Sequence, residues 1–175
     1  MKEIEKKILQ LAQGNQGALE LLYERTKGAV YGLALSIVRN PQDAEDIMQD
    51  TYLRIYRSSG SYRARGKPMA WILTITRNLA MDKVRSRTAR ELPLEEDWIP
   101  DKGSDFSESA LDRMVLDSLL ARLTEEERQI VVLYTAGRLK HREIARILGI
   151  PLGTSLSKYH RSLSKLRKWL EEEQK

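Results

Sequence analysis

The chain has 175 residues, of which 41% are hydrophobic and 31% charged, so it can form one large or two small soluble domains. The absence of cysteine excludes disulfides, thiolate zinc sites and a cysteine nucleophile, and two histidines are few for a metal site or a catalytic triad. No apolar run approaches the ~18 residues of a membrane span and no signal peptide is recognisable, so we expect a cytoplasmic protein without direct membrane insertion.

The net charge of +5 is unevenly distributed along the chain. Residues 1–90 carry 16 Lys/Arg and 9 Asp/Glu (+7), residues 91–108 carry 1 and 7 (−6), and residues 109–175 carry 13 and 9 (+4). The acidic segment also contains helix breakers and lacks periodicity, which is typical of a linker. We therefore predict an all-α protein with two small helical domains, 1–90 and 109–175, joined by an acidic flexible linker, 91–108.

Apolar residues at helical spacing predict four helices in the first domain. The first helix ends at Gly14, and Asn15 is predicted to cap the second. Asn40 before Pro41 predicts the start of the third helix, and Pro68 that of the fourth. The third helix is predicted to turn a polar face outward, and from the residues alone this face is a solvated surface: it consists of Asp43, Asp46, Gln49, Asp50 and Arg54.

A basic loop with one aromatic residue separates the third and fourth helices. It contains Tyr62, Arg63 and Arg65, and the fourth helix adds polar residues beside its apolar ones: Thr74, Arg77, Asn78, Met81 and Arg85. An aromatic ring on which bases stack, next to cations that hold phosphates, suits single-stranded nucleic acid. The alternative is a solvated loop followed by a charged helix. Trp71 is predicted to lie in the core or partly in it.

The second domain has the pattern of a helix-turn-helix. Thr124 and Glu127 predict a capping box, Gly137 ends that helix, and residues 149–154 form a turn that ends in a predicted N-cap at Thr154. The last helix is predicted to bury Tyr159, Leu163, Leu166 and Leu170 and to expose Ser157, Lys158, Arg161, Lys165 and Lys168. Such a basic helix fits the major groove of DNA. The alternative is a structural helical hairpin with a charged face.

Nothing in the sequence indicates catalysis. No nucleophile, base and orienting residue stand out, and glycine-rich phosphate loops are absent. Neither histidine has a partner at metal-ligand spacing. We predict that the protein is not an enzyme and uses no cofactor or metal.

Several motifs together resemble the σ70 family of bacterial RNA polymerase sigma factors. Residues 40–56 (NPQDAEDIMQDTYLRIY) resemble region 2.2, and residues 68–85 (PMAWILTITRNLAMDKVR) resemble region 2.4. Residues 123–134, 141–154 and 158–170 are similar to region 4. Regions 2 and 4 alone, joined by a short linker, are typical of the extracytoplasmic-function (ECF) subfamily, and the resemblance covers nearly the whole chain.

The resemblance implies a transcription initiation factor that binds core RNA polymerase and directs it to promoters. Region 2.2 would dock on the clamp helices of the β′ subunit, with further contacts to the β subunit, which gives Asp46, Gln49 and Asp50 a role. The unpaired −10 strand would lie on Tyr62, Arg63, Arg65, Arg77, Asn78 and Arg85. The −35 duplex would be read by Thr154, Ser157, Lys158, Arg161 and Lys165. ECF sigma factors are commonly held by an anti-sigma factor, which we expect here.

The chain departs from the family at two places. Where the family usually has Pro-x-Gly-Thr-Val and then Lys or Arg, this chain has Ser155 and Leu156. The apolar stripe is predicted to shift by one residue, so Leu156 either packs inward or touches a thymine methyl. Lys140 replaces a common Ser cap, which removes roughly 1 kcal/mol of capping.

Two alternative functions remain open at this stage. One is a free-standing transcriptional regulator that binds duplex operator DNA through the second domain. The other is an interaction protein with a sigma fold that has lost promoter recognition, which the leucine at position 156 suggests.

Overall fold

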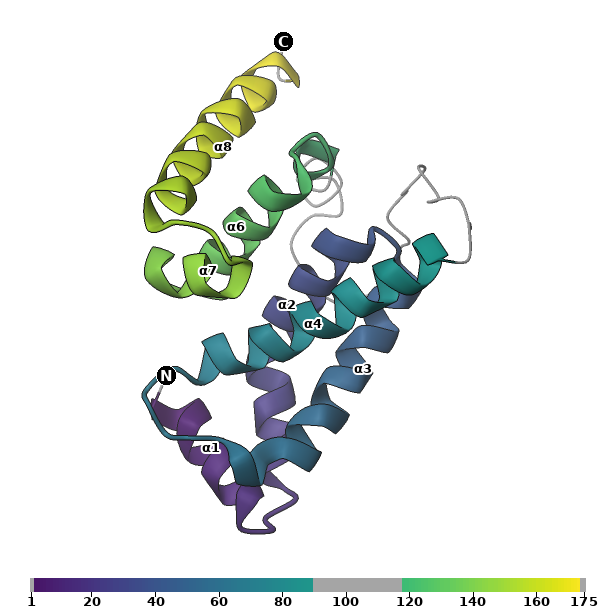
Figure 1. Cartoon of the computed structure of the whole chain (residues 1–175), viewed down its shortest axis with the longest axis vertical. Helices are drawn as coiled ribbons and strands as arrows, with labels where there is room; N and C mark the ends of the chain where they lie inside the picture. Colours follow the sequence, from purple (N-terminus) through teal and green to yellow (C-terminus); the bar gives the residue numbers. More distant parts are fainter. Residues whose placement is uncertain (1, 90–117, 174–175) are drawn as a thin grey trace.

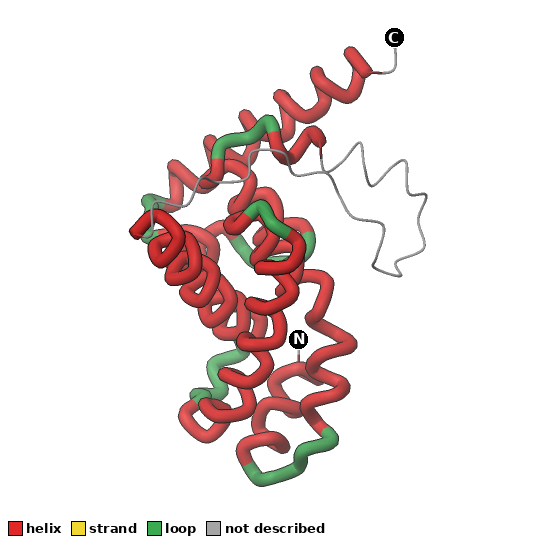
Figure 2. Tube along the Cα trace, turned by 90° about the vertical axis from the view of Figure 1, so that its right-hand side faces the viewer, coloured by secondary structure: helices red, strands yellow, loops and turns green. Residues whose placement is uncertain are grey.

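The computed structural model describes residues 2–89 and 118–173, and within these ranges every regular element is an α-helix or a 3₁₀ turn (Figures 1 and 2). The first unit consists of α1 (Lys2–Ala12), α2 (Ala18–Val38), α3 (Pro41–Ser58), the turn η1 (Ser59–Ser61) and α4 (Pro68–Ala89). The second unit follows a helical stretch at 118–121 and consists of α6 (Glu125–Thr135), α7 (His141–Leu148) and α8 (Leu152–Glu173). The all-α class is confirmed, whereas the linker proposed for 91–108 lies outside the described residues.

The helix starts in the first unit agree with the sequence prediction except at α2. The Asn40 side chain accepts a hydrogen bond from the Asp43 amide at 3.0 Å, with Pro41 in the first turn. Gly14 has a φ of 91° after α1, a conformation that favours glycine. The predicted Asn15 cap is wrong. The turn before α2 is itself nearly helical, so the Asn15 backbone carbonyl, not its side chain, accepts from the Ala18 amide at 3.2 Å.

In the second unit one predicted cap is present, one is wrong, and α7 begins after Lys140 as the sequence predicts. The Thr124–Glu127 capping box is present, with both of its hydrogen bonds formed at 3.1 and 3.4 Å. The predicted N-cap at Thr154 is wrong, because α8 already begins at Leu152. At the start of α7 the Lys140 side chain has no acceptor to offer, and the Glu143 carboxylate instead accepts from the Lys140 amide at 3.0 Å.

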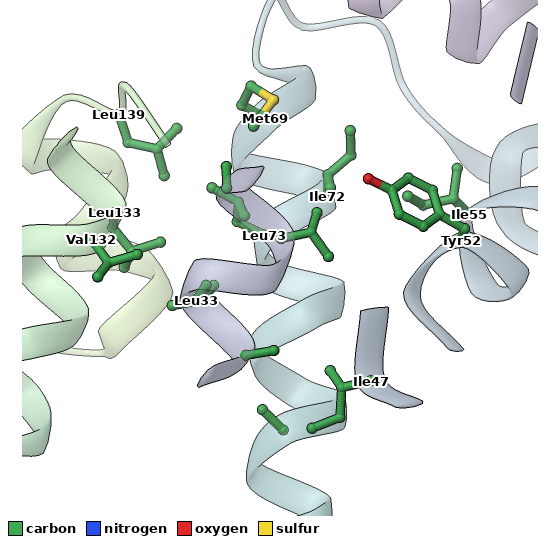
Figure 3. Packing of buried hydrophobic residues seen from close by; sticks show 14 of the residues in the cluster. Leu33, Ile47, Tyr52, Ile55, Met69, Ile72, Leu73, Val132, Leu133 and Leu139 are labelled. Carbon is green, nitrogen blue, oxygen red and sulfur yellow. The ribbon is translucent and has the colours of Figure 1, made fainter. Parts of the chain in front are cut away.

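One continuous hydrophobic core joins the two units. From the first unit come Leu33 and Leu73, and against them pack Val132, Leu133 and Leu139 of the second unit (Figure 3). In the ribbon, α6 lies against α2, and α7 lies near the start of α4 (Figure 1). The two units therefore lie face to face in this structure, which the sequence did not predict.

Close contacts and polar contacts fix this interface. The Arg128 guanidinium donates to the backbone carbonyls of Ser36 at 2.8 Å, Leu120 at 3.2 Å and Leu123 at 3.3 Å. A Cβ at Gly137 would lie 2.7 Å from Leu73 Cδ1, so only glycine allows this approach. Because Arg128 satisfies carbonyls of both units, its side chain is buried although it is charged.

Candidate nucleic-acid interface

A basic cleft with two aromatic rings lies between the loop after α3 and helices α4 and α7. The first unit supplies the loop and the first turns of α4, and α7 forms the opposite wall. The cleft is lined by Ser61, Tyr62, Arg63, Arg65, Lys67, Ala70, Trp71, Thr74, Glu143, Arg146 and Ile147. The structure therefore brings Tyr62, Arg63 and Arg65 together, as the resemblance implies.

Tyr62 is fixed in place within this cleft. Its hydroxyl donates to Glu5 Oε1 at 2.8 Å, and the same carboxylate accepts from the Gly66 amide at 2.9 Å. Its ring lies 4.9 Å from the Trp71 ring at an interplanar angle of 57°. Burial, together with the hydrogen bond to Glu5, raises the pKa of Tyr62 above its ordinary value. Tyr62 is therefore a neutral, oriented ring.

Trp71 was predicted to lie in the core or partly in it, and the structure shows it packed against the core and lining the cleft as well. It is half-buried and lines the cleft beside Tyr62. The sequence did contain a signal for the cleft position of Trp71, because this residue stands in the first turn of the helix that follows the basic loop. A ring at that position can face the loop as well as the core.

The other three residues predicted for the −10 strand do not line this cleft. Arg77 donates from Nε to Gln129 Oε1 of α6 at 3.1 Å. Asn78 is exposed, and exposed Arg85 forms an ion pair with Asp82 at 3.4 Å. These side chains follow α4 away from the loop.

The residues predicted to read duplex DNA divide into two sets on α8. Ser157 and Arg161 are exposed, while Thr154 is partly buried. Lys158 pairs with Glu126 at 2.6 Å and Lys165 with Glu127 at 2.8 Å. Ser157 and Arg161 form hydrogen bonds within α8, whereas the two lysines are held by acidic residues of α6.

These ion pairs change the acidity of the capping carboxylate. Burial pushes the pKa of Glu127 upward, but hydrogen bonds from Lys165 and Thr124 outweigh burial, so the net pKa is lowered. The carboxylate thus stays ionised while it serves both the capping box and Lys165. The second-domain lysines therefore contribute to folding as well as to positive charge.

The outward face of α3 combines acidic and apolar groups. Asp46, Gln49 and Asp50 are exposed, and Leu53 on the same face is 53% exposed. Asp43 was predicted to face outward, and this is wrong: it is buried and pairs with Lys83 at 3.1 Å and Arg87 at 2.7 Å. The cause is α4, whose cations reach the first turn of α3.

Comparison with known proteins decides the family. The sequence matches Sigma-70 region 2 over residues 22–90 and Sigma-70, region 4 over residues 113–166. It is 30% identical over 169 residues to the ECF RNA polymerase sigma factor SigK of Mycobacterium ulcerans, an alignment that covers 93% of this chain and 90% of the relative. The chain belongs to the ECF sigma factors. The resemblance and the function of a transcription initiation factor are confirmed, and a free-standing regulator is not favoured.

Solved structures agree on the fold of this sigma factor. CnrH, solved in complex with the cytosolic domain of CnrY, has a TM-score of 0.70 at 23% identity and covers 97% of this chain and 98% of its own. RpoE of Bartonella quintana, solved with the anti-sigma factor NepR, has a TM-score of 0.72 at 22% identity and covers 87% and 96%. At these identities the likeness concerns the fold alone.

The structure of α8 shows where Ser155 and Leu156, which depart from the family pattern, lie. Ser155 is fully buried, and its Oγ lies 3.1 Å from His141 Nδ1 of α7. Leu156 is 37% exposed, so it points outward rather than into the core. The prediction that Leu163 and Leu170 are buried is wrong, since each is 40% exposed.

These leucines are exposed because other positions of α8 face α6 and α7. Ser155 and Ser162, seven residues apart, are the fully buried positions of α8, with Tyr159 partly buried between them. Leucines one position further along the helix are rotated away from that side. The inward side of this helix therefore combines two fully buried serines with the partly buried Tyr159, Leu166 and Trp169, and a hydrophobic pattern does not reveal the serines.

The described residues contain neither a metal-binding cluster nor a membrane-spanning helix. Within 2–89 and 118–173, no three His, Cys, Asp or Glu side chains are grouped so that they could hold a metal ion. In the same ranges no helix is both long and apolar enough to cross a membrane.

Proposed function

We propose that this sigma factor acts by binding alone and divides promoter recognition between its two units. The first unit binds core polymerase and the unpaired −10 strand, and the second binds the −35 duplex. The observation that carries the proposal is the basic cleft in which Tyr62, Trp71, Arg63 and Arg65 meet. Stacking on such rings returns roughly 1–3 kcal/mol per base, which offsets part of the unstacking of the duplex.

The core-binding face is the outward side of α3. Asp46, Gln49 and Asp50 offer charge and hydrogen-bonding groups, and the 53% exposed Leu53 supplies an apolar contact among them. An exposed leucine ringed by polar residues is the composition of a protein-docking surface. This face would contact the clamp helices of the β′ subunit, and the second unit would contact the β subunit.

Promoter binding requires the two units to separate. Arg77 is proposed to lie along the −10 strand, yet here it is hydrogen-bonded to Gln129 of the second unit. Glu143 and Arg146 of α7 stand in the cleft that the strand would occupy, and Glu143 lies 4.0 Å from Lys67 Nζ. Binding to core polymerase would supply the free energy that opens this arrangement.

Run-off transcription with purified core polymerase and a promoter library tests the proposal. We expect initiation that depends on both the chain and the core enzyme. Asp50→Arg should abolish association with core, because it reverses a charge in the docking face. Glu20→Arg is the matched control, since Glu20 is exposed on α2, and it should leave initiation unchanged. Tight duplex binding without core, and no initiation, would favour a free-standing regulator.

An anti-sigma factor is the second proposed partner. The neighbouring structure of RpoE was solved with the anti-sigma factor NepR, and that of CnrH with the cytosolic domain of CnrY. A partner that holds the two units together would preserve the closed arrangement seen here, and we place this chain in the cytoplasm with core polymerase. Co-purification from cells, followed by loss of initiation when the isolated partner is added back, tests this part.

A further inference from the structure

An apolar edge lies at the start of the helix that is proposed to enter the major groove. Leu152 and Leu156 are one turn apart in the first turns of α8 and are 38% and 37% exposed. In a helix-turn-helix, the N-terminal residues of the second helix contact the edges of the bases. Two leucines there offer no hydrogen bond to a base, so they require another kind of recognition.

The buried serine fixes the orientation of this edge. Ser155 faces α7, where its Oγ lies 3.1 Å from His141 Nδ1, and Ser162 two turns later is also fully buried. Consecutive residues of a helix differ by about 100° in direction. Leu156 could turn inward only if α8 rotated and both serines left their buried positions, so its outward direction belongs to the folded domain.

The surroundings of Leu156 favour nucleic acid over a protein partner. Ser157, His160 and Arg161 are exposed on the same helix, and Arg142 is exposed on α7. The sequence contains no Asp or Glu from residue 144 to residue 170, although six Lys and Arg fall in that stretch, of which Lys158 and Lys165 are paired with α6. A polyanion is drawn to such a surface, and its phosphates would place the helix against the bases.

We propose that Leu156, with Leu152 beside it, reads the C5-methyl groups of thymines in the −35 element. This inference rests on the proposed function of the second unit. Thymine is the base that presents a methyl group in the major groove, and an apolar side chain is its complement. At position 156, where the family usually has a Lys or Arg suited to guanine, this chain has a leucine and would select thymine.

Replacing thymine by deoxyuridine measures the contribution of the C5-methyl group to binding, because the hydrogen-bonding edge of the base is unchanged. The −35 element is first selected from a randomised duplex library with the full chain bound to core polymerase. Each selected thymine is then replaced singly by deoxyuridine, and binding is measured by competition. We expect at least one thymine whose replacement weakens binding about fourfold, the value for one buried methyl group.

Two variants assign the effect to the leucine. Leu156→Ala should lose the difference between thymine and deoxyuridine, whereas Leu163→Ala, a 40% exposed leucine two turns further on, should keep it. Leu156→Arg should shift selection at that position from thymine to guanine.

Equal binding of thymine and deoxyuridine at every position overturns the inference and leaves the proposed function standing. If no sequence is enriched at all, the proposed −35 recognition fails and the inference falls with it.

Discussion

At the scale of single residues, Arg128 shows how a charged side chain can serve as a structural group. Its guanidinium donates to carbonyls at the end of the 118–121 helical stretch and to the Ser36 carbonyl of α2. These acceptors belong to chain segments far apart in sequence. The planar donor fork can satisfy several of them at once, which a lysine could not do.

Removing this donor should therefore destabilise the whole molecule. For Arg128→Met we expect a loss of about 3 kcal/mol in the free energy of unfolding, because several buried carbonyls lose their partner. Urea denaturation of both proteins measures the difference. Arg142→Met is the matched control, since Arg142 is exposed and its replacement should change stability by less than about 0.5 kcal/mol. Equal losses for the two variants would contradict a structural role of Arg128.

His141 couples the helix-turn-helix to pH. It packs against the rings of Tyr134 and Tyr159, 4.9 and 5.1 Å away. Burial, and secondarily the charge of His160, lowers the pKa of His141 below 6.5. The unfolded chain then binds this proton more readily than the folded one. The contribution to stability is thus present above about pH 6.5 and is lost as the pH falls through the folded pKa.

We expect a replacement of His141 to reduce the pH dependence of unfolding. The thermal midpoint of the wild-type protein should fall between about pH 7.5 and pH 5.5, and His141→Asn should show a smaller fall. His160→Asn should retain most of the wild-type fall, because burial is the larger cause of the shift. An identical pH profile for His141→Asn and wild type would assign the dependence to other groups.

At the scale of elements, the start of α7 is incompletely capped. Only the Glu143 carboxylate serves the first turn, by accepting from the Lys140 amide. The side chain of Lys140 is exposed and carries positive charge at the positive end of the helix dipole. An acceptor at this position would satisfy a further amide.

Lys140→Ser should stabilise the protein by about 0.5–1 kcal/mol, because serine completes a capping box with Glu143. The comparison with Lys140→Ala separates the cap from the removal of charge: alanine should bring a smaller gain. Chemical denaturation of the three proteins at one pH measures both steps. Equal stability of the serine and alanine variants would show that the cap contributes nothing here.

Local signals made the elements predictable, whereas the orientation of α8 required the tertiary structure. Asn40, Thr124 and Pro68 were recognised because a cap or a first-turn proline acts on its own helix. Leu163 and Leu170 were misassigned because their apolar spacing predicts burial, while the neighbouring helices contact Ser155 and Ser162 instead. Tyr159 and Leu166 on that side follow the apolar pattern, but the two serines beside them give no apolar signal.

At the scale of the whole molecule, local sequence signals predicted which residues belong to the candidate site, whereas their arrangement depends on tertiary packing. Tyr62, Arg63 and Arg65 are close in sequence, and they were predicted together and lie together. The hydrogen bond between Arg77 and Gln129 joins residues 52 positions apart. The wall that α7 adds to the cleft also depends on how the two units pack, which charge and periodicity do not determine.

An engineered disulfide can lock the closed packing of the two units. No native thiol competes with it, because the chain contains no cysteine of its own. A Cβ built at Gly32 of α2 would lie 3.7 Å from Val132 Cγ1 of α6. Val132 Cγ1 stands one bond beyond Cβ, about where the sulfur of a cysteine would lie. Gly32→Cys with Val132→Cys should therefore bridge the units after an adjustment that brings the two Cβ atoms to the ~3.5–4.5 Å that a disulfide needs. If the units must separate, the oxidised double variant should not initiate transcription with core polymerase, and a reductant should restore activity.

Each single-cysteine variant, treated with the same oxidant, controls for the substitutions and for oxidation elsewhere, and both should remain active. Unfolding measurements should show the oxidised double variant to be the more stable form, by about 2–4 kcal/mol for a bridge that closes a loop of this length. This readout establishes that the bridge has formed without strain. A bridged, stable protein that still initiates at the unbridged rate would mean that the closed arrangement is compatible with promoter binding. In that case Arg77 would remain hydrogen-bonded to Gln129 throughout initiation and would have no part in holding the −10 strand.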